Sequence, residues 1–156
     1  MTVAADNFIY VTGNLTYKDK ATDVLGLVGQ NAVFVWNPVR VSGFSGTSST
    51  PDEWTGMIDT GNREINAAIL SVGHTFQAQN YSRGARGTLK VFGAIAQKFR
   101  GTVSTTDGNG YAKDYQYDDR FRNIAPPKFL TPTSTTYGVT QIATVPAGFK
   151  PTGADG

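Results

Sequence analysis

A short phrase that occurs twice constrains the fold of this chain more than any other feature. Residues 26–33 read GLVGQNAV and residues 93–100 read GAIAQKFR, 67 positions later. Folds built from stacked repeats need similar residues at equivalent places, because each unit buries its core against the next. If residues 37–61 form an insertion of 25 residues, the separation falls to 42, which is two turns of about 20 residues each. Chance recurrence of Gly followed by apolar residues is the alternative.

The rest of the sequence favours strands that stack in parallel. The chain has 18 glycines among 156 residues, and its apolar runs at 24–28 and 32–36 are nearly continuous, as is typical of strands covered on both sides. Residues 65–72 would tolerate a helix, but their β-branched residues and the following Gly73 favour a strand.

We therefore predict an all-β protein with the fold of a right-handed parallel β-helix, or β-solenoid. One domain spans residues 1–156, with a long inserted loop at 37–61 and a polar, aromatic and Pro-rich tail at 102–156 that is extended and packed on the body. If the repeated phrase marks equivalent turns, Leu27 and Ile95 point into one continuous apolar core. Gln30 and Gln97 should then lie in the same column along the axis, two turns apart.

Composition excludes several classes of function. The net charge is +2 and the basic residues are scattered, so we expect no nucleic-acid partner. The chain has no cysteine, which rules out a disulfide framework and a thiolate site. No apolar stretch approaches the length of a membrane span, and the first residues, MTVAADNFIY, lack the features of a signal peptide.

Several segments together carry a resemblance to a known family: GNLTYKD, DVLGLVGQNAVFVW, INAAILSV, GTLKVFGAIAQKFRGTV, GYAKDYQYDDRF and APPKF. They resemble the C-terminal β-solenoid domain of bacterial type IV pilus-associated surface proteins, the PilX-like and large minor-pilin-like group. The resemblance covers about residues 13–129, and GAIAQKFRG followed by YQYDDR and PPKF is its most specific part. It implies a parallel β-helix displayed outside the cell, without catalytic activity. Such proteins usually begin with a leader and an apolar pilin-type helix, so we expect this chain to be an exported portion or a domain used in another setting.

The residues that enzymes use are sparse. His74 is the only histidine and no Ser lies in a G-x-S-x-G motif, so neither a Ser-His-acid triad nor a zinc site is expected, and His74 is interpreted as a turn or surface residue. Asp118 and Asp119 could act as paired carboxylates of a polysaccharide-active β-helix enzyme. The alternative, which the nearby Arg120 and Arg122 favour, is a charge-neutralised segment that pins the tail to the coil.

Residues 107–110 read DGNG and resemble the start of a calcium-binding loop. The bidentate Glu of an EF-hand is missing, because position 118 is Asp118 and no Glu follows it. Asp-Gly and Asn-Gly are common turn dipeptides, so a plain tight turn is the favoured interpretation. We predict no metal site and no cofactor.

Aromatic residues give the candidate binding site. Phe44, Trp54 and Tyr81 are predicted to form a surface for sugar stacking or protein docking around the inserted loop, while capping of the coil is the alternative. Trp36 ends an apolar strand and is predicted to lie in the core. Tyr115 and Tyr117 should share one face of an extended segment.

These features together predict a non-enzymatic, extracellular or cell-surface structural and binding domain associated with a type IV pilus-like filament. Its partners would be pilin-like protein subunits, other copies of itself, or a cell-surface carbohydrate, contacted through the inserted loop. The alternatives are a self-assembling β-solenoid filament subunit, whose exposed end strands would pair, and a polysaccharide-active enzyme.

Overall fold

The computed structural model describes residues 1–41, 54–57 and 61–129, and for residues 40–41 and 54–57 it describes the backbone alone. Within these ranges the chain forms strands and one short 3-10 helix, η1. The strands are β1 (Thr2–Ala5), β2 (Phe8–Val11), β3 (Gly26–Gly29), β4 (Ala32–Val35), β5 (Val39–Val41), β6 (Trp54–Met57), β7 (Arg63–Ser71), β8 (Phe76–Ala78), β9 (Ala85–Gln97) and β10 (Gly110–Tyr117), and η1 spans Asp119–Arg122. No described helix is long and apolar enough to cross a membrane.

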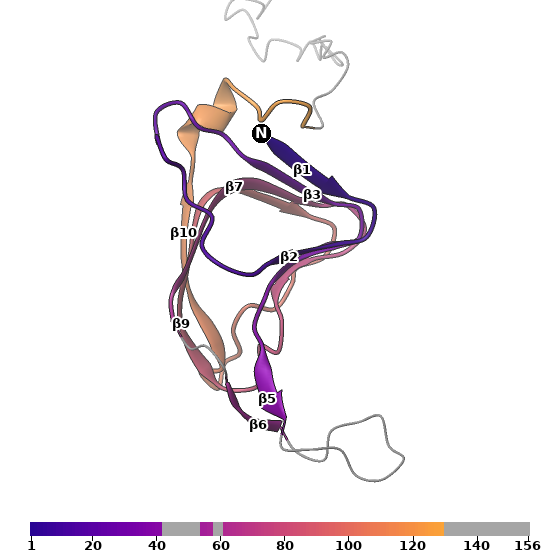
Figure 1. Cartoon of the computed structure of the whole chain (residues 1–156), viewed down its shortest axis with the longest axis vertical. Coiled ribbons are helices and arrows are strands. Elements are labelled where there is room, and N and C mark those ends of the chain that lie inside the picture. Colours follow the sequence, from indigo (N-terminus) through magenta and orange to yellow (C-terminus); the bar gives the residue numbers. More distant parts are fainter. Residues whose placement is uncertain (42–53, 58–60, 130–156) are drawn as a thin grey trace, which may run out of the picture.

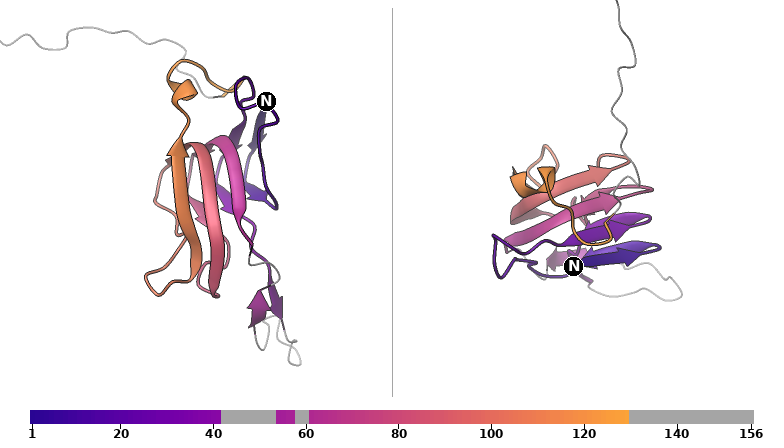
Figure 2. Two further views of the ribbon diagram at one scale, coloured as in Figure 1. Left: turned by 90° about the vertical axis from the view of Figure 1, so that its left-hand side faces the viewer. Right: turned by 90° about the horizontal axis from the view of Figure 1, so that it is seen from above.

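The strands wind into a right-handed parallel β-helix of about four turns, which confirms the predicted fold class. A larger sheet has the strand order β1-β3-β7-β9-β10, a smaller sheet has the order β2-β4-β8, and all pairs in both sheets are parallel. Figure 1 shows the coil from the end formed by β1 and β2, and Figure 2 shows the strands of the larger sheet side by side. Residues 65–72, for which a strand was predicted over a helix, lie almost entirely in β7.

Residues at the same position in successive turns form columns along the axis. The column that begins at Val3 continues through Leu27, Ile69 and Ile95. Leu27 lies in the apolar core and Ile95 packs against it, so the prediction that both point into one core is confirmed.

The predicted glutamine column is wrong by one residue. Gln97 lies in the column of Gly29 and Ser71, not in the column of Gln30. A shift by one residue exchanges the two faces of a strand, and this explains the different environments of the two side chains. Gln30 is exposed, whereas Gln97 accepts hydrogen bonds from the backbone N–H groups of Phe76 and Gly101.

The turns differ in length because one of them carries the insertion. Column partners are 24 residues apart at Thr2 and Gly26, and 26 residues apart at Ala68 and Ala94. Gly26 and Ala68 are 42 residues apart, and the extra residues include an antiparallel hairpin of β5 and β6 that projects from the coil. A regular turn is therefore longer than the 20 residues expected from the sequence.

Alternation of side chains places the core between the two sheets. In β7 the odd-numbered residues Ile65, Ala67 and Ile69 are buried in the core. Val91 fills the column of Ile65 one turn later, and Leu89, which is also buried in the core, lies in the column of Arg63. In the columns of Leu27 and of Ile65, apolar side chains therefore stack on apolar side chains, as in other stacked-repeat folds.

The segment interpreted as a tail begins with a further strand. β10 pairs with β9 and extends the larger sheet, and Tyr111 at its start is buried in the core. A tight turn leads into β10, and Gly110 there has a φ of +83° that favours glycine.

After η1 the chain returns across the coil to the first turns. We call residues 123–129 the closing segment. The Thr2 hydroxyl donates a hydrogen bond to the carbonyl of Pro127, and the Phe129 ring lies so close to Gly26 that a Cβ there would come within 2.6 Å of the ring. The closing segment therefore ties the last turn to the first.

Candidate functional site

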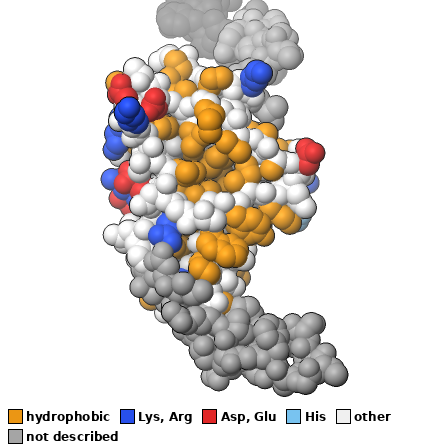
Figure 3. Space-filling view, in the orientation of Figure 1, with side chains coloured by type: hydrophobic (Ala, Val, Ile, Leu, Met, Phe, Trp, Pro, Cys, Tyr) orange, Lys and Arg blue, Asp and Glu red, His pale blue; other side chains and the backbone are white. Residues whose placement is uncertain are grey.

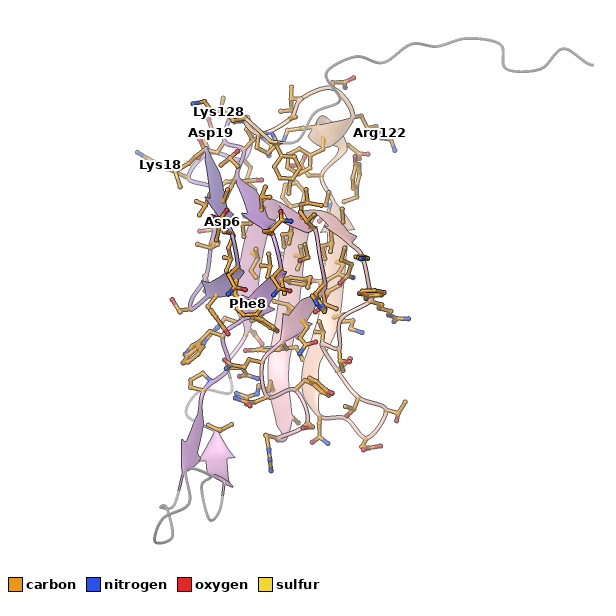
Figure 4. All side chains as sticks on the ribbon, turned by 90° about the vertical axis from the view of Figure 1, so that its right-hand side faces the viewer. Asp6, Phe8, Lys18, Asp19, Arg122 and Lys128 are labelled. Atoms are coloured by element: carbon orange, nitrogen blue, oxygen red, sulfur yellow. The ribbon has the colours of Figure 1, made fainter. Side chains whose placement is uncertain are left out.

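The outer side of the smaller sheet carries four neighbouring aromatic residues. We call this set the aromatic face: Phe8, Tyr10, Phe34 and Trp36. Phe8, Tyr10 and Trp36 are 40%, 44% and 37% exposed, and Phe34 is half-buried between them. Figure 4 looks onto this side of the coil and labels Phe8 there.

Strand alternation produces the aromatic face. The inward positions of β2 and β4 hold apolar residues such as Val11, Val33 and Val35, which are buried in the core. The residues between them point outward, and Tyr10 stands in register with Phe34. Phe8, Tyr10 and Phe34 occupy outward positions of two neighbouring strands and Trp36 directly follows β4, so their rings form one continuous patch.

The rings contact one another closely. Tyr10 and Phe34 are stacked, with centroids 5.3 Å apart and planes at 21°. Phe8 lies 5.5 Å from Phe34 in a tilted arrangement, and Trp36 meets Tyr10 edge-on at 5.8 Å. Aromatic pairs in such geometries contribute stability beyond the area that they bury.

The rim of the aromatic face is polar. A surface hollow of about 330 Å³ beside Phe8 and Phe34 is also lined by Asn31, His74 and Gln77. His74 is exposed in a bend, which confirms its interpretation as a turn or surface residue, and its ring is 6.0 Å from that of Phe99. An apolar centre with a hydrogen-bonding rim is typical of protein docking surfaces.

The stacking of the rings limits what the aromatic face can bind. Sugar rings are usually held against the open face of an aromatic ring, but Tyr10 and Phe34 turn their faces toward each other. The stacked pair therefore offers less open ring face than two separate rings would. This geometry suits a protein side-chain surface better than a single sugar ring.

The sequence located this surface only in part. Phe44 lies outside the described residues, and Trp54 begins β6, of which only the backbone is described. Tyr81 is partly buried and packs against the core. The prediction that Trp36 lies in the core is wrong, because Trp36 follows Val35 on the outward side of the strand. Period-two alternation of aromatic residues in FIYV and AVFVW was the signal that could have identified the face.

Asp118 and Asp119 serve structural ion pairs. Asp118 is 1% exposed and accepts hydrogen bonds from the Arg120 guanidinium, at 2.7 Å from one terminal nitrogen, and from the Arg120 backbone N–H. The hydrogen-bonded guanidinium of Arg120 holds the pKa of Asp118 below its usual range. Asp119 forms an exposed pair with Arg122 at 3.2 Å. The interpretation of a charge-neutralised segment at Asp118 is supported.

Arg120 also connects this pair to the outer side of the larger sheet. Its guanidinium lies 5.2 Å from the centre of the Tyr17 ring, and the Tyr17 ring meets that of Phe92 edge-on at 6.4 Å. The Asp118 carboxylate, the guanidinium and two aromatic rings form a single cluster that anchors η1. The YQYDDR motif thus has a structural role in this chain.

A polar cleft of about 260 Å³ lies elsewhere on the larger sheet. Its centre is a column in which Lys90 stands in register between Glu64 and Asp114. A cation between two carboxylates makes an alternating charge ladder, which stabilises neighbouring strands. The described residues contain no group of three His, Asp or Glu side chains that could hold a metal ion.

Residues 107–110 form a tight turn, as was favoured from the sequence. The Thr105 N–H donates to the carbonyl of Asn109 at 2.9 Å, and Gly108 has a φ of +81°. The Gly110 N–H donates to the carbonyl of Gly84 at 2.9 Å, so the end of this turn is bonded to the residue that precedes β9.

We compared the chain with protein-family models, curated proteins and solved structures, and none of them matched.

Proposed function

We propose that this chain is a non-enzymatic structural and binding domain that acts outside the cell, on a type IV pilus-like filament or another cell-surface structure. The aromatic face carries the proposal. It places three exposed aromatic residues and one half-buried one in a single patch on a rigid sheet. Exposed apolar patches of this kind mark interaction sites in soluble proteins.

The partner that suits this face best is the surface of another protein. The stacked rings offer edges and apolar area, and the rim supplies amide groups such as those of Asn31 and Gln77. Trp36 directly precedes the chain that leads to the β5–β6 hairpin, so the hairpin and the aromatic face would contact the same partner. The resemblance to pilus-associated proteins favours a filament subunit as that partner.

Co-sedimentation with purified bacterial type IV pilus-like filaments tests the proposal. We expect the wild-type chain to pellet with the filaments, and we expect Tyr10→Ser with Trp36→Ser to weaken this binding about tenfold or more, because aromatic residues dominate binding energy at protein interfaces. Ile124→Ser is the matched control, since Ile124 is 44% exposed but lies in the closing segment.

Two results would contradict the proposal. The first is a wild-type chain that stays in the supernatant with intact filaments. The second is equal loss of binding in the Ile124→Ser control. If soluble cell-surface polysaccharide competes with the filaments and is itself bound through Tyr10 and Trp36, the partner is a carbohydrate and the protein-contact proposal fails.

The contribution of the hairpin has a separate test. Replacing residues 38–60 with a short Gly-Ser linker should leave the coil intact, because among the described strands β5 and β6 pair only with each other. Circular dichroism and the melting temperature should stay close to those of the wild type, while filament binding weakens. Unfolding of this variant would show that the insertion is part of the coil.

A further inference from the structure

β10 lies at the edge of the larger sheet, and on one side it has no neighbouring strand among the described residues (Figure 2). On its other side it pairs in parallel with β9, from Gly110 to Tyr117. The N–H of Asp118 continues this pairing by donating to the carbonyl of Gly93, so the position beside Ala94 is also filled. The edge that can take a further strand is therefore the one that β10 turns away from β9, and we call it the free edge.

The pairing with β9 determines which backbone groups lie on the free edge. Along a strand, successive residues point their N–H and C=O groups to opposite sides. Asp118 bonds toward β9, and the even-numbered residues before it, such as Asp114, do the same. The groups on the free edge belong to the odd-numbered residues Lys113, Tyr115 and Tyr117. No other strand in the described part of the chain pairs with them.

The inner side of the free edge lies over the end of the core. Tyr115 stands in register with the buried Val91, and Lys113 stands in register with the buried Leu89. The Tyr115 side chain is 43% exposed and lines two surface hollows of about 270 and 280 Å³. Ile95 also lines both hollows. Inward-facing side chains of an added strand would fill these hollows and extend the apolar core.

The outer side of the free edge ends in an acidic residue. Asp114 follows Glu64 and Lys90 in one column, so negative and positive charges alternate along it. Figure 3 shows acidic and basic side chains near one another at the left, on the outer side of the larger sheet. A basic residue beside Asp114 would continue the alternation, whereas an acidic one would be repelled. On the inner side, Lys113 favours an acidic neighbour for the same reason.

We propose that the free edge binds an extended segment of a partner protein, which adds one strand to the larger sheet beside residues 113–117. The added strand runs antiparallel to β10, because antiparallel pairs are the more stable and often form the edge of an otherwise parallel sheet. From its N-terminus, the segment carries apolar, polar, apolar, basic and acidic residues, opposite residues 117 down to 113. Its backbone hydrogen bonds supply affinity, and its alternate side chains supply specificity.

The charge order favours a partner protein over a second copy of the chain. A second β10 in the antiparallel register that sets Tyr115 opposite Tyr115 would place Tyr117 opposite Lys113, where an acidic residue fits best. It would also place Gln116 opposite Asp114, where a basic residue fits best. The free edge lies at the end of the larger sheet and the aromatic face lies on the smaller sheet, so the two surfaces can be tested separately.

Two synthetic peptides of the same composition test the charge order. One contains Val-Thr-Val-Lys-Glu and the other Val-Thr-Val-Glu-Lys, each flanked by Ser-Gly and used where it is monomeric. In NMR titrations of the full chain, the first should bind at least about tenfold more tightly, because the second sets like charges opposite Asp114 and Lys113. The double variant Lys113→Glu with Asp114→Lys should reverse this preference. Equal binding of the two peptides, or no binding of the first, would overturn the proposal.

Methylation of single peptide nitrogens tests the backbone pairing. The N–H of the second Val, opposite Tyr115, points toward β10, so its N-methyl form should bind at least about tenfold more weakly. The N–H of Thr, opposite Gln116, points away from β10, and the N-methyl form at this residue is the matched control. Equal weakening by the two methyl groups would contradict the stated register.

Hydrogen exchange in the unbound chain tests whether the edge is open. Amides on the free edge should exchange at least about tenfold faster than those bonded to β9, and the first peptide should slow them. The amide of Tyr115 represents the free edge, and that of Gln116 represents the bonded side. Slow exchange at Tyr115 in the unbound chain would overturn the proposal, because residues 130–156 or a second copy would then cover the edge. Exchange that accelerates on dilution would identify the second copy.

Discussion

Asp118 shows how much a single side chain does in this fold. It follows the last residue of β10, caps η1 by accepting the Arg120 N–H, and binds the Arg120 guanidinium. Its backbone N–H also continues the ladder by donating to Gly93 at 3.0 Å. A buried carboxylate is stable here because its oxygens are bound by charged and backbone donors. The Asp118 side chain therefore joins the end of β10 to η1.

Asp118→Asn should lower the free energy of unfolding near neutral pH. The difference from the wild type should disappear in acid. The folded pKa of Asp118 lies below the ordinary value of 3.8, so its stabilisation is present above that value and is lost as the pH falls through the lowered pKa. We expect a loss of about 1–3 kcal/mol in the free energy of unfolding at neutral pH, as for other hydrogen bonds to charged groups. Urea unfolding at neutral pH and at a pH of about 2 measures the difference.

Asp119→Asn is the control for this prediction. Both members of the Asp119–Arg122 pair are largely exposed, at 78% and 72%, so we expect a change of no more than about 0.5 kcal/mol. A loss for Asp118→Asn that stays the same in acid would contradict the ion-pair explanation.

The strands show where sequence patterns succeed and where they fail. The apolar runs predicted the buried parts of β3 and β4, because inward residues of stacked strands must be apolar. The same runs misplaced Trp36, since a continuous apolar run does not reveal which residues point outward. The repeated phrase correctly indicated equivalent turns. The alignment of Gln30 with Gln97 that it suggested is one residue out of register, because Gln97 lies in the column of Gly29 and Ser71. Register depends on corner geometry and hydrogen bonding between turns, which a single sequence does not display.

Leu27→Ala should cost more stability than Val28→Ala, its neighbour in β3. Leu27 is 3% exposed and lies between Val3 and Ile69 in its column, so truncation leaves a cavity worth about 2–5 kcal/mol. Val28 is half-buried on the outer side, where solvent or neighbours fill the space, and we expect about 1 kcal/mol or less. Chemical denaturation of both variants measures the difference, and equal losses would contradict the assigned faces.

At the scale of the whole molecule, the closing segment converts a stack of turns into a closed unit. Stacked repeats contact only their neighbours, and their terminal turns are the least stable. Here Pro127 and Phe129, from beyond the last turn, contact Thr2 and Gly26 in the first two. The PPKF motif, whose role could not be inferred from spacing, therefore protects the first strand.

Phe129→Ala should loosen the first turn more than the middle of the coil. Without the ring against Gly26, β1 loses a packing partner while β7 and β9 keep theirs. We expect the amide of Gly26, which donates to the Met1 carbonyl, to exchange with solvent at least about tenfold faster. Hydrogen exchange followed by NMR measures this rate.

Ile124→Ala, at an exposed position of the same segment, should leave the exchange rate of Gly26 nearly unchanged. Uniform acceleration across β7 and β9 in Phe129→Ala would indicate global destabilisation and would contradict the local role of the ring.

Thr2 and Pro127 are in contact although they lie 125 positions apart in the sequence. This separation determines when the contact can form during synthesis of the chain. A chain made from its N-terminus displays β1 early, but the partner that fastens β1 is made more than a hundred residues later. During that interval the first strand has one neighbour at most, and an open strand edge attracts other chains. Long-range contacts of this kind also slow folding, because the intervening chain must be ordered first. Completion of the first turn is thus among the last steps by which a new molecule reaches its native state.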